Sequence, residues 1–313
     1  MTAYKNVLDM TYRILRKSLS PKVYVLLQKV FGRRKYYYSP FLYMQIVNRY
    51  LKAGPIDCKV ILEVGPGNDI TTAILMILEG AREVFLADEV NELTTHRREF
   101  PNRLQYIESI SQSYKESCEG KLSITEISSR IHMIPHHVSC EFLYQLNIPK
   151  VDCLFSNHVL EHVEDLDDVF SAFKTLVKPG GIMFHSVDLS DHAYHVFTRY
   201  PRLRILNENN VLSHLKYSDG TFKMLNDKKL PMNRVLLPQY IDLCTSHGFA
   251  IRDIWYCQPK KHYHVHPDIL GKTKQEFHDS FMSQINYFEI SAKREEDVAS
   301  SQMGWNLTKL GDC

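Results

Sequence analysis

The chain has 313 residues, of which 44% are apolar and 24% charged, and its formal net charge is +2. This length and apolar content allow a sizeable core and exclude global disorder. Seven cysteines form no C-x-x-C pair, which argues against a zinc ribbon or redox dithiol and favours a reducing cytoplasm. No run approaches the roughly 20 apolar residues of a membrane span, and early charges argue against a signal peptide.

The first 57 residues are predicted to form a basic helical extension. Residues 1–60 carry twelve Lys or Arg residues and only two Asp or Glu. Apolar positions recur at helical spacing up to residue 31, with a break at Ser20-Pro21. A basic and aromatic turn, 33–38, precedes a third helix expected from about Pro40 to Lys52.

Residues 58–313 are predicted to form one α/β domain. Short apolar runs alternate with helical patterns, which indicates βαβ units and a parallel sheet covered on both faces. The expected strands are 60–62, 84–87, 131–134, 151–155 and 181–187, and the expected helices between them include 69–78 and 165–177.

The stretch from about 189 to 237 interrupts this alternation. It is rich in His, Tyr, Asn and Arg and is too long for a simple connection, so we expect a helical cap inserted after the fifth strand. A helix at 239–247 and two further strands, 249–256 and 285–292, are expected to complete the domain.

A glycine turn follows the first expected strand. Gly65 and Gly67 allow the backbone to turn sharply and to approach a ligand closely. Asp88 lies 21 residues after Gly67, at the end of the second strand. A carboxylate at that position can accept hydrogen bonds from the two ribose hydroxyls of a nucleotide.

The residues after the glycine turn favour one nucleotide over another. Dinucleotide sites place a third glycine where this chain has Ile70, and Asn68-Asp69 would set an acidic helix start against a pyrophosphate. S-adenosylmethionine has no phosphate, and its amino group attracts carboxylates. The pattern therefore favours S-adenosylmethionine over NAD.

These segments resemble class I S-adenosylmethionine-dependent methyltransferases. The similar segments are 60–67, the acid at Asp88, 152–163 and the turn at 176–181. The resemblance implies a Rossmann-like seven-stranded methyltransferase sheet. It also implies cofactor contacts from Glu63, Gly65, Pro66, Gly67, Asn68, Asp88, Glu89, Ser139, Ser156 and Asn157. The family's acidic residue after the third strand is missing, and Ser139 or Glu141 would take its place.

A narrower resemblance suggests the acceptor. Residues 185–192, with Asn233-Arg234 and Gln239-Tyr240, resemble methyltransferases of surface-polysaccharide or glycolipid biosynthesis. This implies O-methylation of a sugar or glycan-type hydroxyl. The alternatives are a small metabolite, a lipid or RNA as acceptor, or a catalytically silent scaffold. Intact Gly65, Gly67 and Asp88 argue against a silent protein.

Hydroxyl methylation needs a proton acceptor close to the transferred methyl group. Candidates gather where the fourth and fifth strands end: His158, His185, Asp188 and His192. His185 also suits a buried structural role. His162 and the preceding Glu161 suit capping and anchoring of the following helix.

Two metal sites can be considered from the same residues. The segment 158–162 matches H-x-x-E-H, but it begins at a strand end and not within the helix that this zinc signature requires. His185, Asp188, Asp191 and His192 include two histidines, whereas Mg²⁺ prefers oxygen ligands. We therefore predict no metal.

Three roles remain open for residues 1–38. A basic amphipathic helix suits peripheral contact with an anionic membrane, at the inner membrane surface, where a lipid-linked glycan would lie. The same basic and aromatic residues could instead bind the phosphates and bases of a nucleic acid, but we expect this role less. The third role is a helical lid over the cofactor.

Deletion of residues 1–35 tests the membrane role. The truncated protein is expected to lose binding to anionic liposomes, because the basic face is removed, and to keep its cofactor affinity. Co-sedimentation with liposomes and calorimetry measure the two properties. Unchanged liposome binding would rule out the membrane role.

Overall fold

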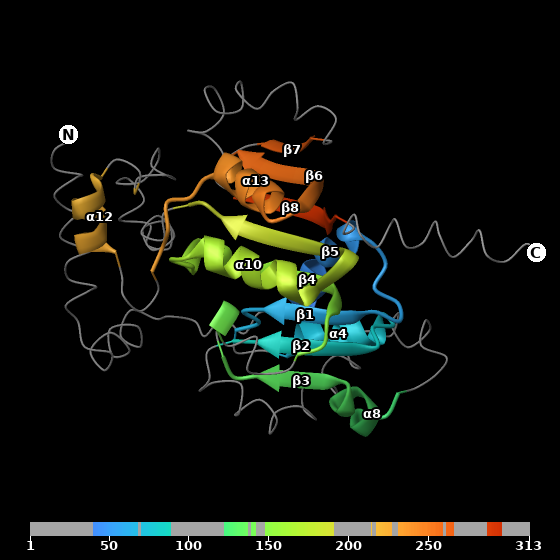
Figure 1. Ribbon diagram of the computed structural model, residues 1–313. Coiled ribbons are helices and arrows are strands. Elements are labelled where there is room, and N and C mark those ends of the chain that lie inside the picture. The colour runs from blue at the N-terminus through green and yellow to red at the C-terminus, as the bar shows by residue number, and fades with distance from the viewer. Residues whose placement is uncertain are drawn as a thin grey trace, which may run out of the picture.

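The computed structural model of the protein describes residues 40–67, 70–88, 122–136, 139–141, 148–190, 214, 217–226, 231–258, 261–265 and 287–295. These residues form a twisted sheet with helices on both faces (Figure 1). The helices expected within residues 1–31 lie outside the described residues, as does most of the expected cap.

The described strands form one sheet in the order β3-β2-β1-β4-β5-β8-β6-β7. The strands are β1 (Val60–Val64), β2 (Glu83–Ala87), β3 (Ile131–Ile134), β4 (Val151–Asn157), β5 (Val177–Asp188), β6 (Phe249–Gln258), β7 (Lys261–Val265) and β8 (Tyr287–Arg294). The first five are parallel, whereas β8 runs antiparallel between β5 and β6. Seven of these strands confirm the predicted sheet. The sequence did not predict β7, which pairs with β6 at the edge.

Helices cover both faces of the sheet. α10 (Leu166–Leu176) and α13 (Leu237–Ser246) lie on the near face in Figure 1, and α4 (Thr71–Leu78) lies on the far face. α3 (Pro40–Tyr50) packs with α4 in the same buried cluster. Each face has its own apolar core, and all five residues of β1 are buried between them. This explains why the strands of the parallel half are nearly continuous apolar runs.

β5 begins earlier than the sequence suggested. Residues 178–180 were expected as a turn, but they form the first part of the strand, with Gly180 at a φ of 74°. The pairing with β4 shifts register between Val151 and Cys153, so the turn is accommodated as an irregularity within the ladder.

Four short helices complete the described structure: η1 (Leu51–Ala53), α8 (Ile124–Ser129), η2 (Leu160–His162) and α12 (Asp219–Leu225). α12 lies within the expected cap. Among the helices of the described residues, none has the length and apolar content that crossing a bilayer requires.

One polar pair is buried in the core beneath α10. His185 and Ser156 are fully buried, and their Nδ1 and Oγ atoms lie 2.7 Å apart. The imidazole stacks on Phe173 with the ring centroids 5.2 Å apart. Burial lowers the pKa of His185 from its ordinary 6.5 to about 3, so the folded protein keeps this ring neutral.

This buried imidazole predicts an acid-sensitive contribution to stability. Below pH 6.5 the unfolded chain binds a proton at His185, and the folded chain does not until the pH reaches about 3. The free energy of unfolding should therefore fall between these values, by at most about 1.4 kcal/mol per pH unit from this group. Urea unfolding at several pH values measures the effect.

His185→Gln is the matched control, because glutamine can still bond Ser156 but does not titrate. The difference in unfolding free energy between the two proteins should change with pH below 6.5. A constant difference down to pH 4 would contradict this account of His185.

Candidate active site

The glycine turn leads from β1 toward α4 with two left-handed residues. Gly65 and Gly67 have φ angles of 67° and 65°. The Gly65 N–H donates to the Ala87 carbonyl at 2.8 Å, which ties the turn to the end of β2. A Cβ on Gly65 would lie 2.3 Å from Cγ2 of Val159, whereas a Cβ on Gly67 would meet nothing within 4 Å. The turn is therefore tightly packed at Gly65 and open at Gly67.

Asp88 lies directly beside this turn. Its Oδ2 accepts the Gly67 N–H at 2.8 Å, and its own N–H donates to Ile134 O at 3.3 Å. The open backbone at Gly67 and this carboxylate provide the space and the hydrogen-bond acceptor that a ribose needs. The residues present thus fit S-adenosylmethionine, with the Asp88–ribose contact remaining a prediction.

Glu63 lies under the turn, on the face covered by α3 and α4. Its side chain is buried, and its carboxylate oxygens accept hydrogen bonds from Tyr50 Oη at 2.9 Å and Thr72 Oγ1 at 2.5 Å. The sequence suggested a cofactor contact for Glu63. The structure shows a carboxylate that joins α3, β1 and α4 below the turn.

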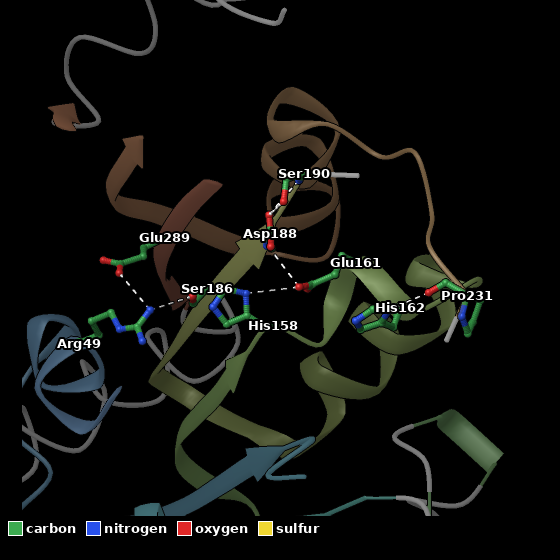
Figure 2. Close-up of polar contacts among 9 residues, drawn as sticks. All are labelled: Arg49, His158, Glu161, His162, Ser186, Asp188, Ser190, Pro231 and Glu289. Carbon is green, nitrogen blue, oxygen red and sulfur yellow. Dashed lines mark hydrogen bonds and ion pairs between the residues drawn. The ribbon is translucent and has the colours of Figure 1, made fainter. Parts of the chain in front are cut away.

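His158 stands at the end of β4 in a left-handed conformation, with a φ of 57°. Its N–H donates to Ser186 O at 2.8 Å, which fixes the backbone against β5. The side chain is 40% exposed, and Figure 2 shows it turned toward Glu161. A non-glycine residue with positive φ is strained and often marks a functional site.

Glu161 is the partner that sequence reasoning missed. It is only 2% exposed, and its Oε1 lies 3.5 Å from His158 Nδ1 and accepts the Asp188 N–H at 3.3 Å. Its Oε2 has no hydrogen-bond partner among the described residues. A buried carboxylate is costly to keep, which favours a role for it.

Asp188 ends β5 next to this pair. Its Oδ1 accepts hydrogen bonds from both the N–H and the hydroxyl of Ser190. The carboxylate therefore shapes the chain as it leaves the sheet, and the Asp188 backbone binds Glu161 (Figure 2).

His162 points away from His158. Its Nδ1 lies 2.7 Å from Pro231 O, and Asn233 donates to Leu160 O and Val163 O at 2.7 and 2.9 Å. These bonds anchor η2 (Leu160–His162) to residues 231–233, as the capping alternative for His162 suggested. In the described part of the chain, no three His, Cys, Asp or Glu side chains could hold a metal ion.

The remaining predicted site residues lie in different parts of the structure. Ser156 and His185 lie in the core and bond each other, which favours packing over contact with substrate. Asn157 ends β4 at the reaction edge, the edge of the sheet where the carboxyl ends of β1, β2, β4 and β5 meet. Its Oδ1 has no hydrogen-bond partner among the described residues. Ser139, half-buried, precedes a cysteine whose N–H donates to Asp168 Oδ2. Asn68, Glu89, Asp191 and His192 lie outside the described residues.

The sheet order, the glycine turn and the acid at the end of β2 define a class I methyltransferase-type α/β protein. The model of a family described as methyltransferase domain matches residues 32–268, and the chain belongs to this family. The protein is thus an S-adenosylmethionine-dependent methyltransferase, as the sequence predicted.

Several solved structures match at low identity. An S-adenosylmethionine dependent methyltransferase from Mesorhizobium loti is 16% identical, with a TM-score of 0.43, over 78% of this chain and 95% of that one. The 1,6-didemethyltoxoflavin-N1-methyltransferase of Burkholderia thailandensis is 14% identical, with a TM-score of 0.44, over 89% and 92%. Geranyl diphosphate C-methyltransferase from Streptomyces coelicolor A3(2) is 13% identical, with a TM-score of 0.44, over 81% and 78%. No curated protein matches the chain.

The two glycines provide a matched test of the turn. Alanine at either position is strained by the positive φ, at a cost of roughly 1 kcal/mol or more, but only Gly65→Ala also meets Val159. Gly65→Ala should therefore weaken S-adenosylmethionine binding and lower the melting temperature more than Gly67→Ala does. Calorimetry and thermal unfolding measure both quantities.

Val159→Ala supplies the control, because it removes the two methyl groups that approach Gly65 most closely. It should recover part of the stability lost in Gly65→Ala. Equal effects of the two glycine variants, with no recovery in the double variant, would contradict the close approach.

Proposed function

We propose that the protein methylates the oxygen of a hydroxyl group on a sugar or glycan, with His158 as the base. The observation that carries this proposal is the pair formed by exposed His158 and buried Glu161 beside the glycine turn. Val159 connects the two features, because it follows His158 and packs against Gly65. This contact supports a base that lies next to the expected cofactor.

The pair suits proton removal from a hydroxyl. The Glu161 carboxylate favours the tautomer of His158 that carries hydrogen on Nδ1, which leaves Nε2 as the proton acceptor. S-adenosylmethionine supplies a methyl group already activated by a sulfonium. When S-adenosylmethionine is bound, it would give its methyl group to the acceptor oxygen and leave as S-adenosylhomocysteine, and His158 Nε2 would accept the hydroxyl proton.

The sugar part of the proposal rests on the narrower resemblance. The structure gives several of those residues supporting roles: Asn233 binds the carbonyls around η2, and Gln239 Oε1 accepts the Leu236 N–H at the start of α13. Arg234 donates to Tyr217 O and pairs with Asp219, which joins residues 231–236 to α12. These residues are expected to build a wall of the acceptor site.

Replacement of the base tests the mechanism. His158→Gln should lower kcat by about 10²- to 10⁴-fold, the usual contribution of a positioned base, and leave S-adenosylmethionine affinity unchanged. Glu161→Gln should lower kcat less, because the imidazole remains. Release of S-adenosylhomocysteine with a panel of sugars and glycans measures the rates.

His247→Gln serves as the matched histidine control, because His247 follows α13 and pairs with Asp167 of α10, away from His158. It should retain the full rate. A His158→Gln protein that methylates sugar hydroxyls at the normal rate would refute the proposed base. Transfer to nitrogen or sulfur acceptors alone would refute the acceptor class.

A further inference from the structure

Two buried polar atoms close to the proposed base have no hydrogen-bond partner among the described residues. One is the hydroxyl of Tyr240 in α13, whose side chain is fully buried. The other is Oε2 of Glu161, a residue that is 2% exposed. A buried polar group without a hydrogen bond costs free energy, so folded proteins keep few of them and each calls for an explanation.

The end of β5 brings Tyr240 near Glu161. The Tyr240 ring packs against Phe288 of β8, with the ring centroids 5.1 Å apart. Phe288 pairs with Val187 of β5. The next residue of that strand, Asp188, donates its N–H to Glu161 Oε1 at 3.3 Å (Figure 2). The Tyr240 ring therefore packs beside the strand end that holds the carboxylate.

The segment that leads into α13 is fastened to Glu161 as well. The Asn233 N–H donates to Glu161 O at 2.8 Å, and three residues later Leu236 O accepts the Tyr240 N–H at 3.2 Å. Burial raises the pKa of Tyr240 above its usual range, the Asn233 side chain lowers it, and the charge of Glu161 raises it further. The charge of Glu161 thus acts on the hydroxyl, which stays protonated and able to donate.

Of these two polar neighbours, Glu161 has the greater capacity to accept a hydrogen bond. Both amide hydrogens of Asn233 donate to backbone carbonyls in and directly after η2, and its Oδ1 accepts the Val235 N–H at 3.2 Å. Glu161 Oε2 accepts no bond within the described structure. A bond from a hydroxyl to a carboxylate is charge-assisted, and it is roughly twice as strong as one between neutral groups.

We propose that Tyr240 is a positioning residue for methyl transfer, whose hydroxyl donates to Glu161 Oε2 directly or through one bridging water. This inference rests on the proposed function, because it acts through His158. With the Asp188 N–H on Oε1 and Tyr240 on Oε2, both oxygens of the carboxylate are held. Oε1 then stays against His158 Nδ1, which keeps hydrogen on Nδ1 and leaves Nε2 to accept the hydroxyl proton.

A packing role for Tyr240 makes a different prediction. If the hydroxyl is only tolerated in the core, Tyr240→Phe keeps the ring against Phe288 and removes an unsatisfied group. Stability should then be equal or higher, and His158 should be unaffected. If the hydroxyl positions Glu161, the same substitution should change the state of the His158 ring.

The test follows the tautomer of His158 by ¹⁵N NMR of the full chain labelled in its histidine rings. The measurement is made at alkaline pH, where the imidazole is neutral, and it needs no methyl acceptor. Loss of a signal in His158→Gln identifies that of His158. The parent should show hydrogen on Nδ1, and Tyr240→Phe should shift the balance toward hydrogen on Nε2.

Glu161→Gln and Tyr43→Phe make the result specific. Tyr240→Phe should shift the tautomer much less in a Glu161→Gln background than in the parent, because the two residues act through one contact. Tyr43, a buried tyrosine of α3 in the core on the other face, is the matched control, and Tyr43→Phe should cause no shift. Thermal unfolding confirms that each variant is folded.

Three results would overturn the positioning role. The first is an unchanged His158 tautomer in Tyr240→Phe. The second is an equal shift in Tyr43→Phe. The third is a Tyr240→Phe shift of the same size with and without the Glu161 carboxylate.

Activity separates this proposal from the proposed function. With a sugar acceptor, Tyr240→Phe should lower kcat about tenfold, less than loss of the base itself, and leave S-adenosylmethionine affinity unchanged. A tautomer shift without methylation of any sugar would support the positioning role and refute the sugar acceptor. Sugar methylation at the parent rate in Tyr240→Phe, with an unchanged tautomer, would refute the positioning role and support the O-methyltransferase.

Discussion

The close approach of Gly65 to Val159 is the constraint on which the reaction edge depends. It brings the turn after β1 against the turn after β4, so the expected cofactor site and His158 share one wall. No side chain can be accommodated at Gly65 without movement of this wall. The hydrogen bond from Gly65 to Ala87 O brings in the end of β2, and with it Asp88. Because β1, β2 and β4 are parallel, their carboxyl ends lie at one edge of the sheet. Ligands bind at this edge in open α/β sheets.

A second set of contacts joins the segment before β1 to the same edge. Tyr50 is fully buried, stacks on Phe155 with ring centroids 4.7 Å apart, and donates to Glu63 below the glycine turn. Arg49, near the end of α3, reaches Ser186, and Lys52, in η1, reaches Glu289. α3 is thus both a core helix and a source of charge beside the proposed base.

The sequence predicted the sheet because its strands are apolar runs bounded by glycine and polar turns. The apolar pattern does not show to which face of the sheet each polar side chain within a strand points. His185 was a catalytic candidate by its place near a strand end, and Ser156 was a cofactor contact implied by the family resemblance, yet the two side chains are buried beneath α10 and bond each other. The sequence also could not reveal β7, since an edge strand needs less apolar patterning and pairs on one side only.

The predicted site was similarly incomplete where partners come from distant segments. Glu161 was paired with His162 by adjacency, but the 3₁₀ turn directs Glu161 to His158 and His162 to Pro231. Arg49 reaches Ser186 across 137 positions of sequence, a separation that no local pattern encodes. By contrast, Gly65, Gly67 and Asp88 were predictable, because a turn that needs positive φ and an acid at a strand end leave a local pattern.

The central claim is that the edge formed by Gly65, Gly67 and Asp88 binds S-adenosylmethionine. Calorimetric titration with S-adenosylmethionine, S-adenosylhomocysteine and NAD tests it most directly. Asp88→Ala is compared with Asp88→Asn, which can still accept the Gly67 N–H. The account predicts binding of both sulfur nucleotides, strong weakening in both variants and no binding of NAD. Tight binding of NAD, or no binding of either sulfur nucleotide, would contradict it.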